Sequence, residues 1–134
     1  MKNQDFETTK TPIVLTTGIY DLLKEHIRKK KLNKTNEERL EKELKNAKQV
    51  LNRDLPENVV TVNTEVLLRD LQTDEEIKQK FVAPKKAKRK NGTTSILSEI
   101  GVATLGYQEN AIIQWDLLAG EKYLQILKVS KLAV

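Results

Sequence analysis

Two stretches near the start of the chain place apolar residues every three or four positions, the spacing of an amphipathic helix. The first stretch follows Thr16 and Thr17, either of which can cap a helix. It stops at four consecutive cations, Arg28 to Lys31. The second stretch begins only a few residues later, so the pattern predicts two helices that fold back on each other as an antiparallel hairpin.

The second helix has a recognisable start and a predicted end. Thr35 and Glu38 have the spacing of a capping box, in which each side chain bonds the other residue's backbone amide. The apolar stripe continues to Leu51, and Pro56 should terminate the helix. At 1.5 Å per residue, we expect this short coiled coil to project by roughly 25 Å, with the basic turn at its tip.

Downstream of Val59 the apolar period changes to two, which is typical of strands with one buried face. We expect five strands in the segments 60–68, 77–81, 93–97, 111–117 and 123–129. One short helix should lie within 99–106 and end at Gly106. The sequence therefore predicts an α+β fold, with an antiparallel sheet and one short helix after the hairpin.

These patterns divide the chain of 134 residues into three parts. Residues 1–10 are polar and aperiodic, and we interpret them as a flexible tail. Residues 11–56 form the hairpin region, which opens with a brief strand at 12–15, and residues 57–134 form the sheet domain.

Composition excludes several classes of site. The chain has no cysteine and one histidine, so we expect no disulfide, no zinc site and no other metal or cofactor. The first residues lack the apolar core of a signal peptide, and no apolar run approaches the ~20 residues that span a bilayer. We expect a cytoplasmic monomer with no membrane partner.

The net charge of +5 is concentrated in two places, the hairpin turn and a second basic run. That run could make weak phosphate contacts with nucleic acid, or it could be a solvated loop. Its cations are Lys85, Lys86, Lys88, Arg89 and Lys90.

The sheet segment resembles a known family. "VVTVNTEVLLRDLQTDEEI" followed by "SILSEIGVATLGYQENAIIQWDLLAGEKYLQILKV" resembles the C-terminal, FKBP-like domain of the GreA/GreB transcript-cleavage factors. The entering strand and the short hairpin are similar to the Rnk-like branch, named as regulators of nucleoside diphosphate kinase. The resemblance covers about residues 12–131, and the matching positions are Asp70, Leu71, Thr73, Glu75, Glu76, Ser98, Ile100, Ala103, Leu105, Gly106 and Gly120.

The resemblance implies binding to bacterial RNA polymerase, with the sheet domain on the rim of the secondary channel and the hairpin directed inward. By the same resemblance, Ser98, Glu99 and Ile100 would contact the polymerase. Glu99 stands where the family has a proline.

The hairpin tip differs from that of the cleavage factors, which use two acidic residues there to help hold a metal ion. Leu32 and Thr35 occupy the corresponding positions here, and neither is a carboxylate. We therefore expect a non-enzymatic regulator that competes with cleavage factors and does not stimulate cleavage. The alternative is a cleavage factor with displaced acids, Glu37 and Glu38. The candidate tip residues are Lys30, Lys31, Leu32, Asn33, Lys34, Thr35, Glu37 and Glu38.

Three further interpretations of the sequence stay open beside these. The lysines of the turn could be ordinary solvated charges that favour the C-terminal end of the first helix. The chain could bind nucleic acid by itself. A prolyl isomerase is disfavoured, because such a site needs an aromatic-lined pocket and the chain has few aromatic residues.

Overall fold

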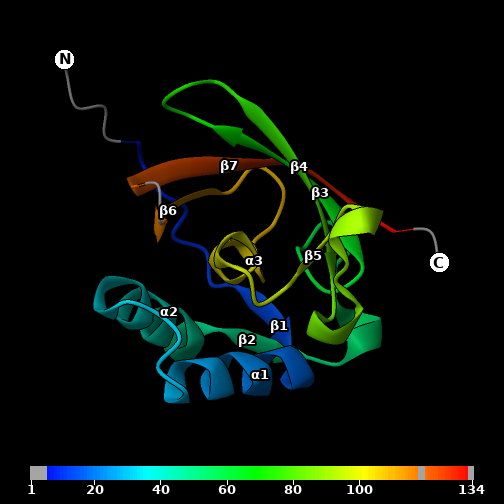
Figure 1. The fold of residues 1–134 in the computed structure, drawn as a ribbon. Helices are drawn as coiled ribbons and strands as arrows, with labels where there is room; N and C mark the ends of the chain where they lie inside the picture. Colours follow the sequence, from blue (N-terminus) through cyan, green and yellow to red (C-terminus); the bar gives the residue numbers. More distant parts are fainter. Residues whose placement is uncertain (1–5, 118–119, 133–134) are drawn as a thin grey trace.

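A computed structural model describes residues 6–117 and 120–132 of the chain. A short strand and two helices come first, a five-stranded sheet follows, and a short helix interrupts the strands of that sheet (Figure 1). This confirms the predicted α+β fold class. The elements are β1 (Val14–Thr16), α1 (Thr17–Arg28), α2 (Lys34–Asn46), β2 (Lys48–Val50), β3 (Thr64–Asp70), β4 (Glu76–Val82), β5 (Thr93–Ser95), α3 (Glu99–Thr104), β6 (Ile112–Leu117) and β7 (Gly120–Lys131).

The larger sheet has the strand order β5-β4-β3-β7-β6. Adjacent strands of this sheet pair antiparallel, except β4 and β5, which pair in parallel. Side chains of β3 alternate between buried and half-buried, as the period of two predicts, and Val66 and Leu68 are fully buried. The strand starts at Thr64 and not at Val60, because the preceding Asn63 takes a left-handed φ of 62°.

The hairpin helices differ from the prediction at the end of α2. Thr16 caps α1 as expected, its side chain accepting a hydrogen bond from the amide of Ile19. The predicted extension of α2 almost to Pro56 is wrong, because α2 ends at Asn46 and residues 48–50 form β2. That strand pairs in parallel with β1, which leaves Leu51 with 56% of its surface exposed.

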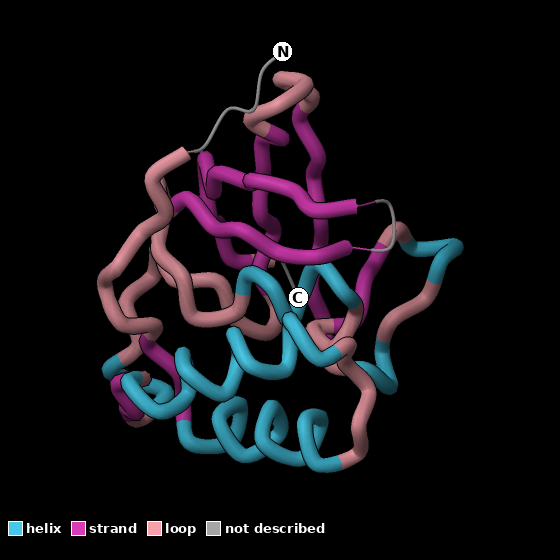
Figure 2. Tube along the Cα trace, turned by 90° about the vertical axis from the view of Figure 1, so that its left-hand side faces the viewer, coloured by secondary structure: helices cyan, strands magenta, loops and turns pink. Residues whose placement is uncertain are grey.

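The hairpin lies against the rest of the protein. Figures 1 and 2 show α1 and α2 side by side, with α3 between them and the large sheet. Buried residues from the hairpin, such as Leu23 and Leu40, belong to the same hydrophobic cluster as Leu68 and Ile126 of the sheet. The expectation of a projecting finger is therefore wrong, because burying this apolar surface favours the folded-back arrangement.

The segment before β1 also contacts the sheet. The amide of Thr9 donates to the carbonyl of Ile112 (2.8 Å), and the Thr9 hydroxyl accepts from the Ile112 amide (2.8 Å). The ring of Phe6 packs 5.3 Å from that of Tyr123. Half of the segment predicted as a tail, residues 1–5, lies outside the described residues. The division at residues 10/11 and 56/57 stays a prediction.

Candidate functional site

The turn between α1 and α2, residues 29–33, has the sequence KKKLN. It reverses the chain through Lys30, which adopts a left-handed φ of 57°. The Lys30 ammonium donates to the carboxylate of Glu37 at 3.3 Å. On the other side of the turn, Glu25 forms ion pairs with Arg28 and, at 3.9 Å, with Lys29. The turn itself carries no carboxylate, and its nearest acid on α2 is paired with a lysine.

Only some of the predicted tip residues face solvent. Leu32 is half-buried and packs against the hydrophobic core. Asn33 caps α2 by accepting from the amide of Asn36 at 2.8 Å. The predicted capping role of Thr35 is therefore wrong. The exposed tip residues are Lys30, Lys31, Asn33, Lys34, Thr35 and Glu38, and Glu37 is half-buried.

Polar contacts hold the start of α2 on strand β6. The Asn36 side chain donates to the Asp116 carbonyl (2.7 Å) and accepts from the Asp116 amide (3.1 Å). Asn33 donates to the Asp116 carboxylate at 3.1 Å, and Arg39 pairs at 2.7 Å with Glu121 of the neighbouring strand β7. Asn36 is only 4% exposed. Sequence reasoning did not single out Asn36, since no local pattern connects it to a strand 80 residues away.

His26 lies on α1 near the turn and is half-buried. Burial lowers the pKa of its imidazole, because the charged form loses hydration. The positive charges of Lys31 and Lys29 lower it further. His26 therefore favours the neutral form, and the positive potential of the turn comes from lysine and arginine.

The other predicted contact residues begin helix α3. Ser98 caps the helix, accepting from the amide of Gly101 at 3.1 Å. Glu99 is exposed and Ile100 is half-buried, with its side chain against the core. A side chain at Gly101 would place Cβ 2.5 Å from the Ile96 carbonyl oxygen, so glycine lets α3 approach the preceding loop closely.

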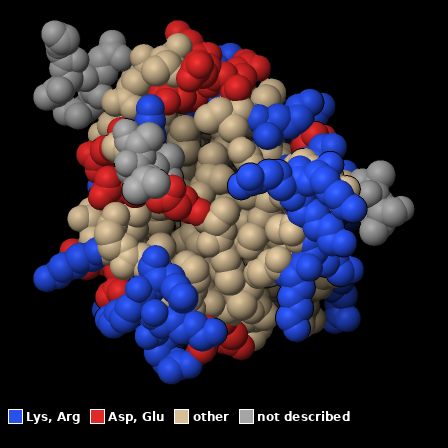
Figure 3. Space-filling model, viewed as in Figure 1, with Lys and Arg blue, Asp and Glu red and all other residues tan. Residues whose placement is uncertain are grey.

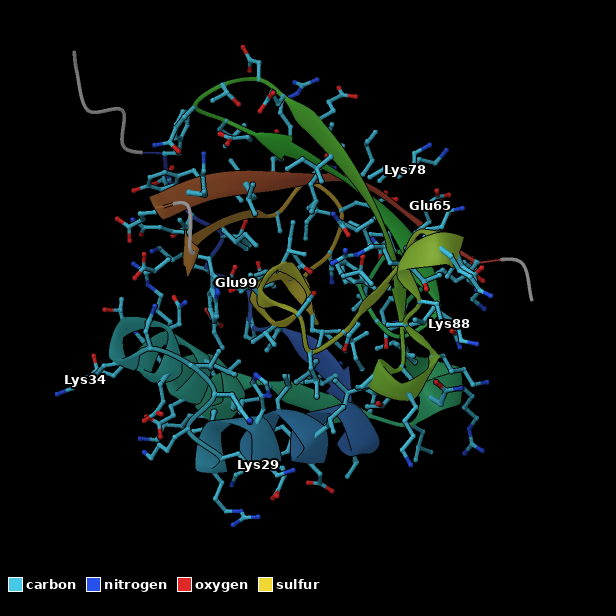
Figure 4. The ribbon with its side chains drawn as sticks, in the orientation of Figure 1. Lys29, Lys34, Glu65, Lys78, Lys88 and Glu99 are labelled. Carbon is cyan, nitrogen blue, oxygen red and sulfur yellow. The ribbon has the colours of Figure 1, made fainter. Side chains whose placement is uncertain are left out.

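Basic side chains gather at two places on one face. Figure 3 shows one cluster over the hairpin and another over the connection between β4 and β5, with a largely uncharged surface between them. Figure 4 places Lys29 and Lys34 at the hairpin, Lys88 on the β4–β5 connection, and Glu99 between Lys34 and Lys88. The connection contains two short 3-10 turns, Pro84–Lys86 and Arg89–Asn91, and its predicted cations are all exposed.

Neither a metal centre nor a membrane span emerges from the residues that the structure describes. No group of three or more histidine, aspartate or glutamate side chains in those ranges could hold a metal ion. None of the helices in the same ranges is long and apolar enough to cross a bilayer.

Together these features define an α+β protein in which a helical hairpin is docked on a five-stranded sheet. The family model described as "Transcription elongation factor, GreA/GreB, C-term" matches residues 55–131. The chain belongs to the GreA/GreB family of transcription elongation factors, as the resemblance predicted.

Curated relatives and a solved structure support the same family assignment. The chain is 31% identical over 91 residues to the regulator of nucleoside diphosphate kinase of Escherichia coli K12, covering 67% of each protein. It is 31% identical over 90 residues to the transcription elongation factor GreA of Chloroherpeton thalassium, covering 67% of this chain and 57% of that protein. A solved GreA/GreB elongation factor from Nitrosomonas europaea is 28% identical, with a TM-score of 0.63 over 90% of this chain and 99% of that one.

Proposed function

We propose that the chain is a transcription regulator that binds bacterial RNA polymerase at its secondary channel and does not stimulate transcript cleavage. Family membership supports the polymerase as partner. The proposal that the chain does not stimulate cleavage depends on the hairpin turn, which has three lysines and no carboxylate. Metal-assisted cleavage needs carboxylate oxygens near the metal, and a cluster of cations repels a divalent ion.

The state of Glu37 supports the same proposal. Its carboxylate is half-buried and paired with Lys30, so it is not presented as a free ligand at the end of the hairpin. Glu38 is exposed, but it lies one residue further along α2, beside a strongly basic turn. A regulator that occupies the channel without donating acids would compete with cleavage factors for the same position.

The start of α3 would supply the second contact. Glu99 lies on the face that also carries the two basic clusters, and the surface between those clusters is largely uncharged (Figures 3 and 4). An exposed glutamate at this position suits a basic partner surface, whereas the flanking lysines suit acidic groups or phosphates. The cations of the β4–β5 connection would make weak, salt-sensitive contacts with nucleic acid in the complex.

The test is co-purification with core RNA polymerase, followed by a transcript-cleavage assay on arrested complexes. We expect binding, no cleavage by this chain alone, and inhibition of cleavage when it is added to a true cleavage factor. Failure to bind core polymerase at micromolar protein would overturn the proposal.

Two variants separate the two mechanisms. If the chain itself cleaves, and Glu37→Ala or Glu38→Ala abolishes that cleavage, the displaced-acid alternative is correct.

Docking through α3 has its own test. Glu99→Lys should weaken polymerase binding, whereas Glu57→Lys, at an exposed position outside α3, should not.

A further inference from the structure

A cavity of about 430 Å³ lies between α2, strand β6 and the segment that precedes β1. Its volume falls within the range of small-molecule sites, roughly 300–1,000 Å³. The side chains that matter most for its chemistry are Arg39 and Glu43 of α2, Trp115 of β6, Tyr107, and Lys10. The cavity is separate from the exposed residues of the hairpin turn.

Two side chains of the cavity wall have donors without an acceptor. The indole Nε1 of Trp115 and the guanidinium Nη1 of Arg39 are both buried and form no hydrogen bond. Within the described residues only one other side-chain nitrogen or oxygen, Nε of Arg69, is in this condition. Trp115 is 5% exposed, so its indole N–H becomes available to an acceptor in the cavity only when the side chain shifts. Buried polar groups are nearly always paired, so two unpaired donors on residues that line one cavity are an unusual feature of this wall.

The charges of the lining have the same implication. Three cations, Lys10, Arg39 and Lys42, line the cavity against one lining carboxylate, Glu43, and the guanidinium of Arg39 is also paired with Glu121 at 2.7 Å. Glu43 already accepts from the phenol of Tyr107 at 2.8 Å, and burial, together with this carboxylate, raises the pKa of that phenol. Tyr107 therefore stays protonated, and the remaining polar groups of the cavity favour an anion.

Apolar and aromatic side chains complete the wall. Ile113 and Trp115 of β6, Ala103 of α3, Pro12 and the ring of Tyr107 supply flat or aliphatic surface. From these observations we infer that the cavity binds a small organic anion, whose carboxylate or phosphate group accepts hydrogen bonds from Arg39 and Trp115 and whose flat apolar body packs beside the aromatic rings.

Such a ligand would also act on the hairpin. Arg39 and Glu43 belong to α2, whereas Trp115 belongs to β6, so a bound molecule contacts both the hairpin and the sheet. A ligand that binds only the docked arrangement shifts the population toward it. The cavity therefore offers a way for a metabolite to hold the hairpin against the sheet.

The lone tryptophan makes the test direct. Trp115 is the one tryptophan of the chain, so intrinsic fluorescence reports on this cavity. We would titrate the full chain with benzoate and with uridine monophosphate, and in parallel with their neutral counterparts benzyl alcohol and uridine. A saturable change with at least one anion, and none with its neutral counterpart, is the expected result. If neither anion gives saturation at millimolar concentration, or if the neutral molecules act equally, the inference is wrong. The anion that responds tells whether the head group is a carboxylate or a phosphate.

Two variants control for folding and for hairpin docking. Arg39→Gln and Glu121→Gln both break the same 2.7 Å ion pair, but only the first removes the guanidinium from the cavity. Arg39→Gln should weaken anion binding by about tenfold or more, whereas Glu121→Gln should leave it unchanged or tighter. Equal weakening in the two variants would show that the fluorescence follows the ion pair, and would overturn the assignment.

Discussion

The side-chain amide of Asn36 satisfies both backbone hydrogen-bonding groups of Asp116, donating to its carbonyl at 2.7 Å and accepting from its amide at 3.1 Å. Strand β6 lies at the edge of the sheet, where every second residue presents an unpaired amide and carbonyl outward. Asn36 therefore acts as a one-residue substitute for the missing neighbouring strand. This contact fixes the position of the hairpin relative to the sheet.

Removal of that amide should destabilise the protein. Asn36→Ala leaves the Asp116 amide and carbonyl without partners, and we expect the free energy of unfolding to fall by about 1–3 kcal/mol. Asn36→Asp should be at least as damaging, because it sets a carboxylate against the Asp116 carbonyl. Urea denaturation measures both. The neighbouring Thr35 is exposed, so Thr35→Ala should change stability by less than about 0.5 kcal/mol. Equal effects of Asn36→Ala and Thr35→Ala would contradict this role.

The cap of α2 gives a second comparison. Asn33→Ala removes the acceptor for the Asn36 amide and should lower the free energy of unfolding by about 1 kcal/mol. Asn33→Ser keeps a capping oxygen but loses the donor to the Asp116 carboxylate, so its cost should be smaller. If Thr35→Ala were the more costly change, the capping box predicted from sequence would be correct after all.

A third prediction concerns two glycines in opposite surroundings. Gly101→Ala would force a Cβ to within 2.5 Å of a backbone oxygen, and we expect a loss of about 1–3 kcal/mol in unfolding free energy. Gly18 lies in α1, and a Cβ added there would have no neighbouring atom within 4 Å. Gly18→Ala should therefore stabilise the chain by about 0.5–1 kcal/mol. Thermal unfolding of the two variants beside the parent protein tests this, and a stable Gly101→Ala protein would show that α3 can move away from the loop.

The pKa of His26 provides a test by NMR. The chain has one histidine, so one set of imidazole signals titrates, and we expect a midpoint below the ordinary 6.5. Because the folded pKa is lowered, the unfolded chain binds more protons between the folded pKa and 6.5. The contribution of His26 to stability is present above 6.5 and is lost as the pH falls through the folded pKa.

Charge variants distinguish the causes of that shift. Lys31→Gln should raise the pKa of His26, because one of its positive neighbours is gone, whereas the distant Lys45→Gln should leave it unchanged. A midpoint that does not respond to Lys31→Gln would leave burial and the charge of Lys29 as the causes of the lowered pKa.

Local patterns in the sequence were sufficient to predict most of the fold. The alternation in β3 and β4, the Thr16 cap and the end of α3 near Gly106 follow from short-range physics, and the structure confirms them. The end of α2 does not follow, because Val50 and Leu51 continue the helical spacing. What ends the helix is pairing of residues 48–50 with β1, more than thirty residues earlier in the chain.

The site was less predictable for the same reason. Asn33 and Thr35 are both good capping residues, and the choice between them coincides with a contact from Asn33 to Asp116, 83 positions away. Likewise, a basic turn between two helices gives no sign that Asn36 will satisfy a sheet edge. The cations of the turn were identified from the sequence, whereas its position beside β6 depends on the tertiary fold.

The parallel pairing of β1 with β2 has a consequence for the evolution of this fold. Thr16, the last residue before α1, is the register partner of Val50, which follows α2. Both ends of the helical hairpin are thus held side by side by the pairing of β1 with β2. A hairpin of a different length could therefore be inserted between β1 and β2, provided both helices change by whole turns. The connections of the five-stranded sheet would stay the same. The contacts between α2 and β6, such as that of Asn36 with Asp116, would have to change with the length of the hairpin.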